Sequence, residues 1–209
     1  MENLPAIIVA IGGVISAIAT PLAAWFAYNQ YTKNKMTDLK VEQYKKDMEA
    51  KANRRADHSG IVYGELWDVL HTLDCDRVYI VQPHPLGNEA LLSVYYEVKR
   101  KGIEPMKPHI QQMPIAEVAN FNRSLIENQF LYIEDVNTVE DKVAHSIFSS
   151  YGCDKAIVQK LNDRRHDWTG SIFCEFTSSA EMPSEEDARE VLKKAASSIQ
   201  YLLPEFIAA

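Results

Sequence analysis

The side chains that could catalyse a reaction or bind a metal are scattered along this sequence. It contains six histidines: His58, His71, His84, His109, His145 and His166. Zinc sites on helices need two histidines one turn apart, as in HxxxH or HExxH, and no pair here has that spacing. A P-loop and a GxGxxG motif are also missing. We therefore predict no catalytic site, no metal site and no cofactor, and we expect that the protein is not an enzyme.

The cysteines, Cys75, Cys153 and Cys174, are odd in number and show no CxxC spacing. Disulfide frameworks of secreted domains use an even number of cysteines, whereas reduced thiols are usual inside cells. Cys174 also stands next to Glu175 in a segment with the alternation of a strand, which favours a place in the core. We therefore expect buried thiols or a reducing compartment rather than a disulfide framework.

One alternating pattern groups polar side chains on a predicted strand. In the segment 91–98, Ser93, Tyr95 and Glu97 should share a face, because successive side chains of a strand point to opposite sides. The opposite face should carry Leu92, Val94, Tyr96 and Val98. A sheet with one face in water shows the same alternation, so the pattern fits both a solvated face and a binding face.

Periodicity places helices and strands in an order that defines the fold class. Helical spacing of apolar residues occurs at 61–73, 116–127, 139–150 and 185–203, and strand-like runs occur at 77–82, 91–98, 130–134, 156–161 and 171–176. Pro83 to Asn88 should form the turn of a hairpin, and Ser184 with Asp187 has the pattern of a capping box. This order requires a mostly antiparallel sheet with helices on its faces, an α+β fold.

The first residues of the chain have the pattern of a membrane-spanning helix. No charged residue occurs from Leu4 to Tyr28, and about 20 apolar residues are enough to cross a bilayer as a helix. Trp25 and Tyr31 lie near one end of this run, where aromatic rings favour the lipid headgroups. Small residues at steps of three and four would let such helices pack together; they are Ala6, Ala10, Gly13, Ala17, Thr20 and Ala24.

Charge predicts the orientation of this span and the class of partner. Residues 32–57 are polar and rich in helix formers, and their many lysines and arginines follow the span, whereas none precedes it. Cytoplasmic flanks carry such an excess, so the C-terminal domain should be cytoplasmic and the protein a single-pass protein of the inner membrane. The net charge of -7 argues against nucleic acid as a partner. We predict an anchor at 1–31, a helical stalk at 32–57 and one domain at 58–209.

Several features of this domain occur in the order found in one family of sensory domains. They are the strand DRVYIV at 76–81, His84 in the following turn, YE at 96–97, GI at 102–103, GC at 152–153 and WTGSIF at 168–173. With these features the run from Gly64 to Phe176 resembles a GAF domain. The resemblance implies a GAF-like antiparallel sheet whose one face is covered by the first and last helices, which often form a dimer interface.

The resemblance also implies where a ligand would bind. The other sheet face should form a pocket under the connecting helices, with Ser93, Tyr95 and Glu97 at its mouth and His84 at its rim. The NKFDE pattern of similar cyclic-nucleotide-binding domains and the Cys-His pair of bilin attachment are both absent from this sequence. The resemblance therefore does not extend to those two ligands.

Two functions fit this layout. The first is a membrane-anchored sensory or regulatory binding module, homo-oligomeric through the span and the first and last helices, that acts through a small ligand or a regulatory protein. The alternative is a protein similar to the T-even-type phage holins, in which the span forms the membrane lesion and the soluble domain senses a regulator. Holins of that type place the domain outside the cytoplasm, whereas the lysines here predict the opposite orientation.

Overall fold

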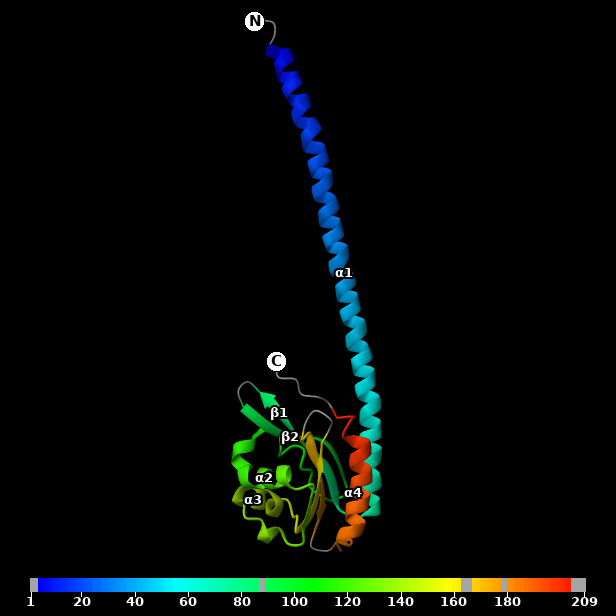
Figure 1. Cartoon of the computed structure of the whole chain (residues 1–209), viewed down its shortest axis with the longest axis vertical. Helices are drawn as coiled ribbons and strands as arrows, with labels where there is room; N and C mark the ends of the chain where they lie inside the picture. Colours follow the sequence, from blue (N-terminus) through cyan, green and yellow to red (C-terminus); the bar gives the residue numbers. More distant parts are fainter. Residues whose placement is uncertain (1–3, 87–88, 163–166, 178–179, 204–209) are drawn as a thin grey trace. The chain divides into compact units, whose positions relative to one another are not determined.

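The computed structural model describes residues 4–86, 89–162, 167–177 and 180–203, without the side chains of residues 4–20, 51, 52, 55 and 86. The chain divides into two compact units, Met1–Arg54 and Arg55–Ala209. One long helix, α1 (Leu4–Thr72), forms the described part of the first unit and the beginning of the second (Figure 1).

In the first unit, α1 contains the segments predicted as membrane span and stalk. Side chains from 21 to 50 are almost all exposed, and Glu42 pairs with Lys46 one turn later at 2.8 Å. A search of the described residues finds no helix that is long and apolar enough to cross a membrane. Most of the predicted span falls outside the described side chains, including the packing residues Ala6, Ala10, Gly13, Ala17 and Thr20, and Ala24 is exposed.

In the second unit, α1 corrects the prediction of a separate helix after Gly60. The helix passes through Gly60 and Gly64 and ends at Thr72. A glycine in a helix interior costs about 1 kcal/mol relative to alanine. Val62, Leu66 and Leu70 are fully buried in the core, and burying one such side chain stabilises by about 1.5–3 kcal/mol. Packing of this apolar face therefore outweighs the low helix propensity of glycine.

The second unit is built on one antiparallel sheet. Its strands are β1 (Arg77–Leu86), β2 (Glu89–Lys99), β3 (Met113–Pro114), β4 (Phe130–Ile133), β5 (Lys155–Leu161) and β6 (Gly170–Phe176). Their order across the sheet is β3-β2-β1-β6-β5-β4. All of the strand pairs are antiparallel, which confirms the predicted α+β class.

Helices cover the two faces of this sheet in separate sets. One face packs against α1 and α4 (Glu185–Ile199), which lie side by side in Figure 1. The other face is covered by η1 (Ile115–Val118), α2 (Ala119–Glu127), η2 (Val136–Thr138) and α3 (Lys142–Ser150). Ser184 caps α4 as predicted, since its hydroxyl oxygen accepts a hydrogen bond from the Asp187 N–H. We call these two sides the α1/α4 face and the α2/α3 face.

Two strand predictions needed correction. β1 continues through Pro83 and Pro85, where a turn was expected, because β6 pairs only with residues 77–81. Beyond Val81, β1 has no β6 partner on one side, so the N–H that proline lacks is not needed for strand pairing there. β3 was not predicted at all, since its two residues are too short to show any alternation.

Candidate functional site

A small cavity lies between the sheet and the helices of the α2/α3 face. Its volume is about 40 Å³, a few times the roughly 10–15 Å³ that a cavity needs to hold one water molecule. The parallel rings of Tyr79 and Phe173, with centroids 5.0 Å apart, line it from the sheet, and Phe121 and Phe148 line it from the helices. The other lining residues are Val81, Leu92, Ile110, Met113, Val118, Asn122, Leu125, Ala144 and Ile147. Because aromatic rings fill most of the space, the cavity admits only a molecule of a few heavy atoms.

Asn122 of α2 is the one amide in this lining. Its side chain is 5% exposed, and its Oδ1 accepts no hydrogen bond from any residue that the structure describes. A buried polar atom without a partner costs about 1–3 kcal/mol. Such atoms are rare in native proteins and often mark a place that a ligand or water completes. The surface of the cavity is therefore almost wholly apolar, and Asn122, one of its lining residues, has a buried acceptor without a described partner.

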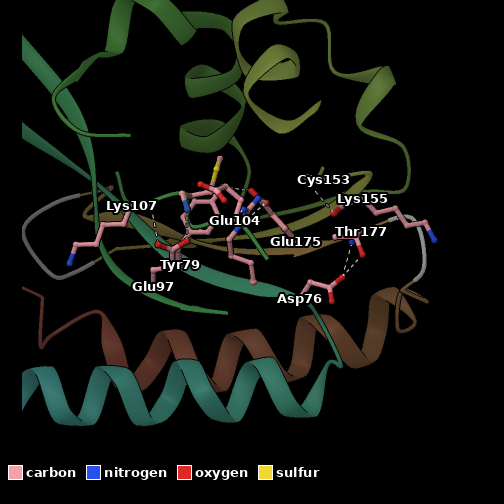
Figure 2. A network of polar contacts seen from close by, with 11 residues as sticks. Asp76, Tyr79, Glu97, Glu104, Lys107, Cys153, Lys155, Glu175 and Thr177 are labelled. Carbon is pink, nitrogen blue, oxygen red and sulfur yellow. Dashed lines mark hydrogen bonds and ion pairs between the residues drawn. The ribbon is translucent and has the colours of Figure 1, made fainter. Parts of the chain in front are cut away.

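A buried ion pair lies on the same sheet face, beside the cavity. Arg77 of β1 and Glu175 of β6 are direct register partners, and each is 1% exposed. Arg77 donates two hydrogen bonds to Oε2 of Glu175, from Nη2 and from Nε at 3.0 Å. The Tyr79 hydroxyl donates to Oε1 of the same carboxylate (Figure 2). Because the ring of Tyr79 also lines the cavity, the polar network and the cavity share a wall.

Burial and the charge of Glu175 set the protonation of this network. Burial, and then the nearby Glu175 charge, raise the pKa of Tyr79 well above its usual value, so its hydroxyl remains a donor. Burial works against the Arg77 charge, but Glu175 outweighs it and raises the pKa of Arg77. Burial raises the pKa of Glu175, and Arg77 and Tyr79 oppose that rise. Burial also raises the pKa of Cys153, which keeps this neighbouring thiol protonated and unreactive.

Hydrogen bonds hold the loop after β2 against this network. The carboxylate of Glu97 accepts hydrogen bonds from the backbone N–H groups of Met106, at 2.5 Å, and Lys107, at 3.0 Å. Arg77 donates from Nη1 to the carbonyl oxygen of Glu104 (Figure 2). Glu97, predicted as a ligand-binding residue, therefore uses both carboxylate oxygens to hold a loop of the protein itself.

A β-bulge separates the residues that were predicted to share a face. The register between β1 and β2 shifts between Ile80, which lies opposite Tyr96, and Val81, which lies opposite Val94, so Tyr95 is the extra residue of the bulge. Side chains before and after the bulge therefore alternate out of phase. Glu97 lies opposite Tyr79 on the α2/α3 face, whereas Ser93 points to the other face. The sequence contained no sign of the bulge, and the predicted common face is wrong for this reason.

The structure does bring together two of the other predicted residues. Nε2 of His84 lies 2.8 Å from Oγ of Ser93, and both side chains are buried. Ser93 Oγ also accepts a hydrogen bond from the N–H of Gln112 at 2.9 Å, just before β3. The His84 and Tyr95 rings lie edge to face, with centroids 6.2 Å apart. These residues tie the β1–β2 hairpin to β3, and none of them is among the described residues that line the cavity.

Cysteines and metal-ligand clusters add no further chemistry to the site. Cys75, Cys153 and Cys174 are all free and buried. Within the described ranges, no group of three His, Cys, Asp or Glu side chains is placed to hold a metal ion. The residues that do define the site, Arg77, Glu175 and Asn122, were not predicted as a group. Only Glu175 has a sequence signal, a carboxylate inside the otherwise apolar run 172–176, whereas Arg77 and Asn122 each have polar neighbours in the sequence.

Comparisons with known proteins agree with this architecture. No family model and no curated protein matches the chain. Among solved structures, the blue-light-absorbing form of the Thermosynechococcus elongatus PixJ GAF domain matches with a TM-score of 0.58 and 12% identity, over 71% of this chain and 86% of that one. The GAF domain/HD domain protein from Geobacter sulfurreducens matches with a TM-score of 0.52 and 11% identity, over 71% of this chain and 95% of that one.

A third solved structure is described as bound to a ligand. It is the phycoerythrobilin-bound GAF domain from a cyanobacterial phytochrome, with a TM-score of 0.54 and 15% identity, over 75% of this chain and 90% of that one. Identities this low show the fold alone. The second unit of the chain therefore has a GAF-like fold, which confirms the predicted fold resemblance.

Proposed function

We propose that this chain is a sensory or regulatory binding module whose GAF-like unit takes a small ligand into the cavity between the sheet and helices α2 and α3. The observation that carries the proposal is the apolar cavity lined by Asn122, whose Oδ1 has no partner among the described residues. A mostly apolar pocket is the usual form of a small-molecule site.

The chemistry of the cavity defines the ligand class. At about 40 Å³ and with an almost wholly apolar lining, it suits a mostly apolar molecule of a few heavy atoms. A bilin, such as the one in the phytochrome domain above, is far larger than this space, and this chain's three cysteines are all buried. We therefore propose a ligand of the size of a short-chain alcohol or amine rather than a bilin.

A direct test uses ethanol and 1-propanol as probes and NMR of the methyl groups of Val118, Leu125 and Ile147. We expect saturable shifts of these methyl signals in the wild-type protein. Ala144→Leu places three more carbons in the cavity and should abolish the response. Ala119→Leu makes the same change on the exposed side of α2 and should preserve it. Absence of saturable shifts in the wild type, or equal shifts in Ala144→Leu, would overturn the proposal.

The N-terminal segment is proposed to anchor this module in a membrane, oligomerise through its small residues and leave the GAF-like unit in the cytoplasm. The support is the uncharged run from Leu4 to Tyr28 followed by lysines. Full-length protein should sediment with membranes, and a chain that lacks residues 1–31 should not. Full-length chain in the soluble fraction would contradict the anchor.

Orientation separates the sensory proposal from the holin-like alternative. In Asp167→Cys the new thiol is exposed, whereas the three native thiols are buried. An impermeant maleimide should label this variant only after lysis if the unit is cytoplasmic. Labelling in intact cells would reverse the orientation and favour the holin-like function.

A further inference from the structure

Strand β4 forms an edge of the sheet with unpaired main-chain groups. In the part of the chain that the structure describes, β4 pairs only with β5. The Lys160 N–H donates to the Gln129 carbonyl oxygen, so this register pair is a hydrogen-bonded one. Antiparallel pairs alternate between bonded and non-bonded, which turns the N–H and C=O groups of Phe130 and Tyr132 away from β5. This edge can therefore accept another extended strand.

An open groove of about 860 Å³ follows this edge. Its lining includes Leu131 and Ile133 of β4, Ser124 of α2 on one sheet face, and Glu185 of α4 on the other. Because α2 and α4 lie on opposite faces, a groove that touches both must run along the edge between them. The space is thus beside β4, and its lining includes Tyr132, whose main-chain groups turn away from β5.

The charge of the groove selects the side chains of an added strand. Its lining carries the carboxylates of Glu134, Asp135, Glu140, Asp141 and Glu185 and no lysine or arginine. Asp141 caps α3 and Glu185 pairs with Arg189, whereas none of the described basic residues forms an ion pair with Glu134 or Glu140. Burial, and then the negative charge of Glu134 and Glu185, raise the pKa of Tyr132 in the same place. The edge therefore lies in a negative potential.

We propose that the β4 edge is a docking site for an extended, basic segment of a partner protein, which adds to the sheet as a seventh strand and places lysine or arginine side chains against Glu134 and Glu140. Main-chain hydrogen bonds to Phe130 and Tyr132 supply the affinity of such β-strand addition, and the carboxylates supply its selectivity. The groove shares Phe121 with the cavity proposed above, but Glu134 and Glu140 do not line that cavity, so ligand binding there and peptide binding here can be tested independently.

The probe is a fluorescent alternating Lys–Val octapeptide, titrated into the full-length protein at low ionic strength. We expect saturable binding that the variant Glu134→Lys/Glu140→Lys weakens by about tenfold or more. The matched control Glu117→Lys/Glu190→Lys changes the net charge equally at exposed positions outside the groove and should change the affinity by less than about twofold. Equal weakening by both double variants would show a general charge effect and overturn the proposal.

A second peptide separates strand addition from simple charge attraction. The same octapeptide, N-methylated at alternate residues, keeps its charge but loses the N–H groups along one edge. We expect its affinity to fall by about tenfold or more if main-chain hydrogen bonds carry the binding. Equal affinity of the two peptides would overturn strand addition.

Discussion

The two faces of the sheet differ in kind. On the α1/α4 face, Ile80, Leu66 and Leu192 belong to one core of fully buried apolar side chains. The α2/α3 face contains a cavity and a buried ion pair; of two buried amides whose oxygens lack a described partner, Asn122 lies there and Gln82 on the opposite side of the sheet. Burial of apolar side chains stabilises the fold by itself. A buried charge or polar atom costs free energy unless an opposite charge or a hydrogen-bond partner offsets that cost. We therefore expect stability to reside mainly on the first face, opposite the face of the proposed ligand site.

The largest effect should come from breaking the ion pair of the α2/α3 face. Arg77→Met leaves the carboxylate of Glu175 buried without its cation and should lower the free energy of unfolding by about 3–5 kcal/mol. The measurement is denaturant unfolding of the full-length chain. The double variant Arg77→Met/Glu175→Leu removes both charges and should recover at least about half of that loss, because a buried pair is worth little against apolar residues of similar volume.

The outcome of this cycle decides what the pair does. Recovery in the double variant would mean that the pair fixes the Glu104–Lys107 loop and the Tyr79 ring rather than stabilising the fold. A double variant as unstable as the single one would show that the network is a main source of stability, and the distinction between the two faces would fail.

A second experiment compares equal truncations on the two faces. Leu192→Ala on the α1/α4 face should cost about 2–5 kcal/mol, the usual range for a buried leucine. Leu125→Ala should cost less, because Leu125 already borders a cavity and has fewer contacts to lose. Calorimetry of both variants tests the order. Leu125→Ala should also gain saturable binding of benzene, which Leu192→Ala should lack, since the enlarged space is apolar.

A third substitution should stabilise the protein at the expense of binding. Asn122→Leu removes the unsatisfied Oδ1 and fills apolar space, so the free energy of unfolding should rise by about 1–2 kcal/mol. The methyl shifts caused by 1-propanol should weaken in the same variant. Asn128→Leu, at an exposed C-cap position, is a control that should not gain stability. A loss of stability in Asn122→Leu would show that the amide has a structural role.

Sequence patterns predicted the elements of this fold better than the site. Periodicity placed the helices and most strands within a few residues, because apolar spacing depends on local geometry alone. The bulge at Tyr95 shifts alternation by one residue and put Glu97 and Ser93 on different faces. The pairing of Arg77 with Glu175 depends on the register of strands about a hundred residues apart, which no local pattern encodes. The anchor, by contrast, remains a prediction from the sequence.

The smallest of these effects concerns the cap that joins the two helices over the cavity. Asp141 accepts hydrogen bonds from Val143 and Ala144 at the start of α3 and from the Phe121 N–H of α2 at 3.2 Å. Burial acts to raise the pKa of Asp141, but these backbone donors outweigh it, and the pKa lies below its usual value. A carboxyl whose pKa is lowered by folding stabilises the native state above its unfolded pKa of about 3.9, and that contribution is lost as the pH falls through the folded value.

Asp141→Asn keeps one acceptor oxygen but cannot ionise, so it should lower the free energy of unfolding by about 1 kcal/mol at neutral pH. The difference from the wild type should shrink as the pH falls from about 4 through the lower folded pKa, because the unfolded chain binds the proton first and the native carboxylate binds it only at lower pH. Urea unfolding of both proteins across this range tests the sign, with Asp68→Asn at an exposed position of α1 as control. A difference that stays constant down to the lowest pH would mean that the charge of Asp141 contributes nothing. The contact between α2 and α3 would then depend on hydrogen-bond geometry alone, and its contribution to stability would not change with pH.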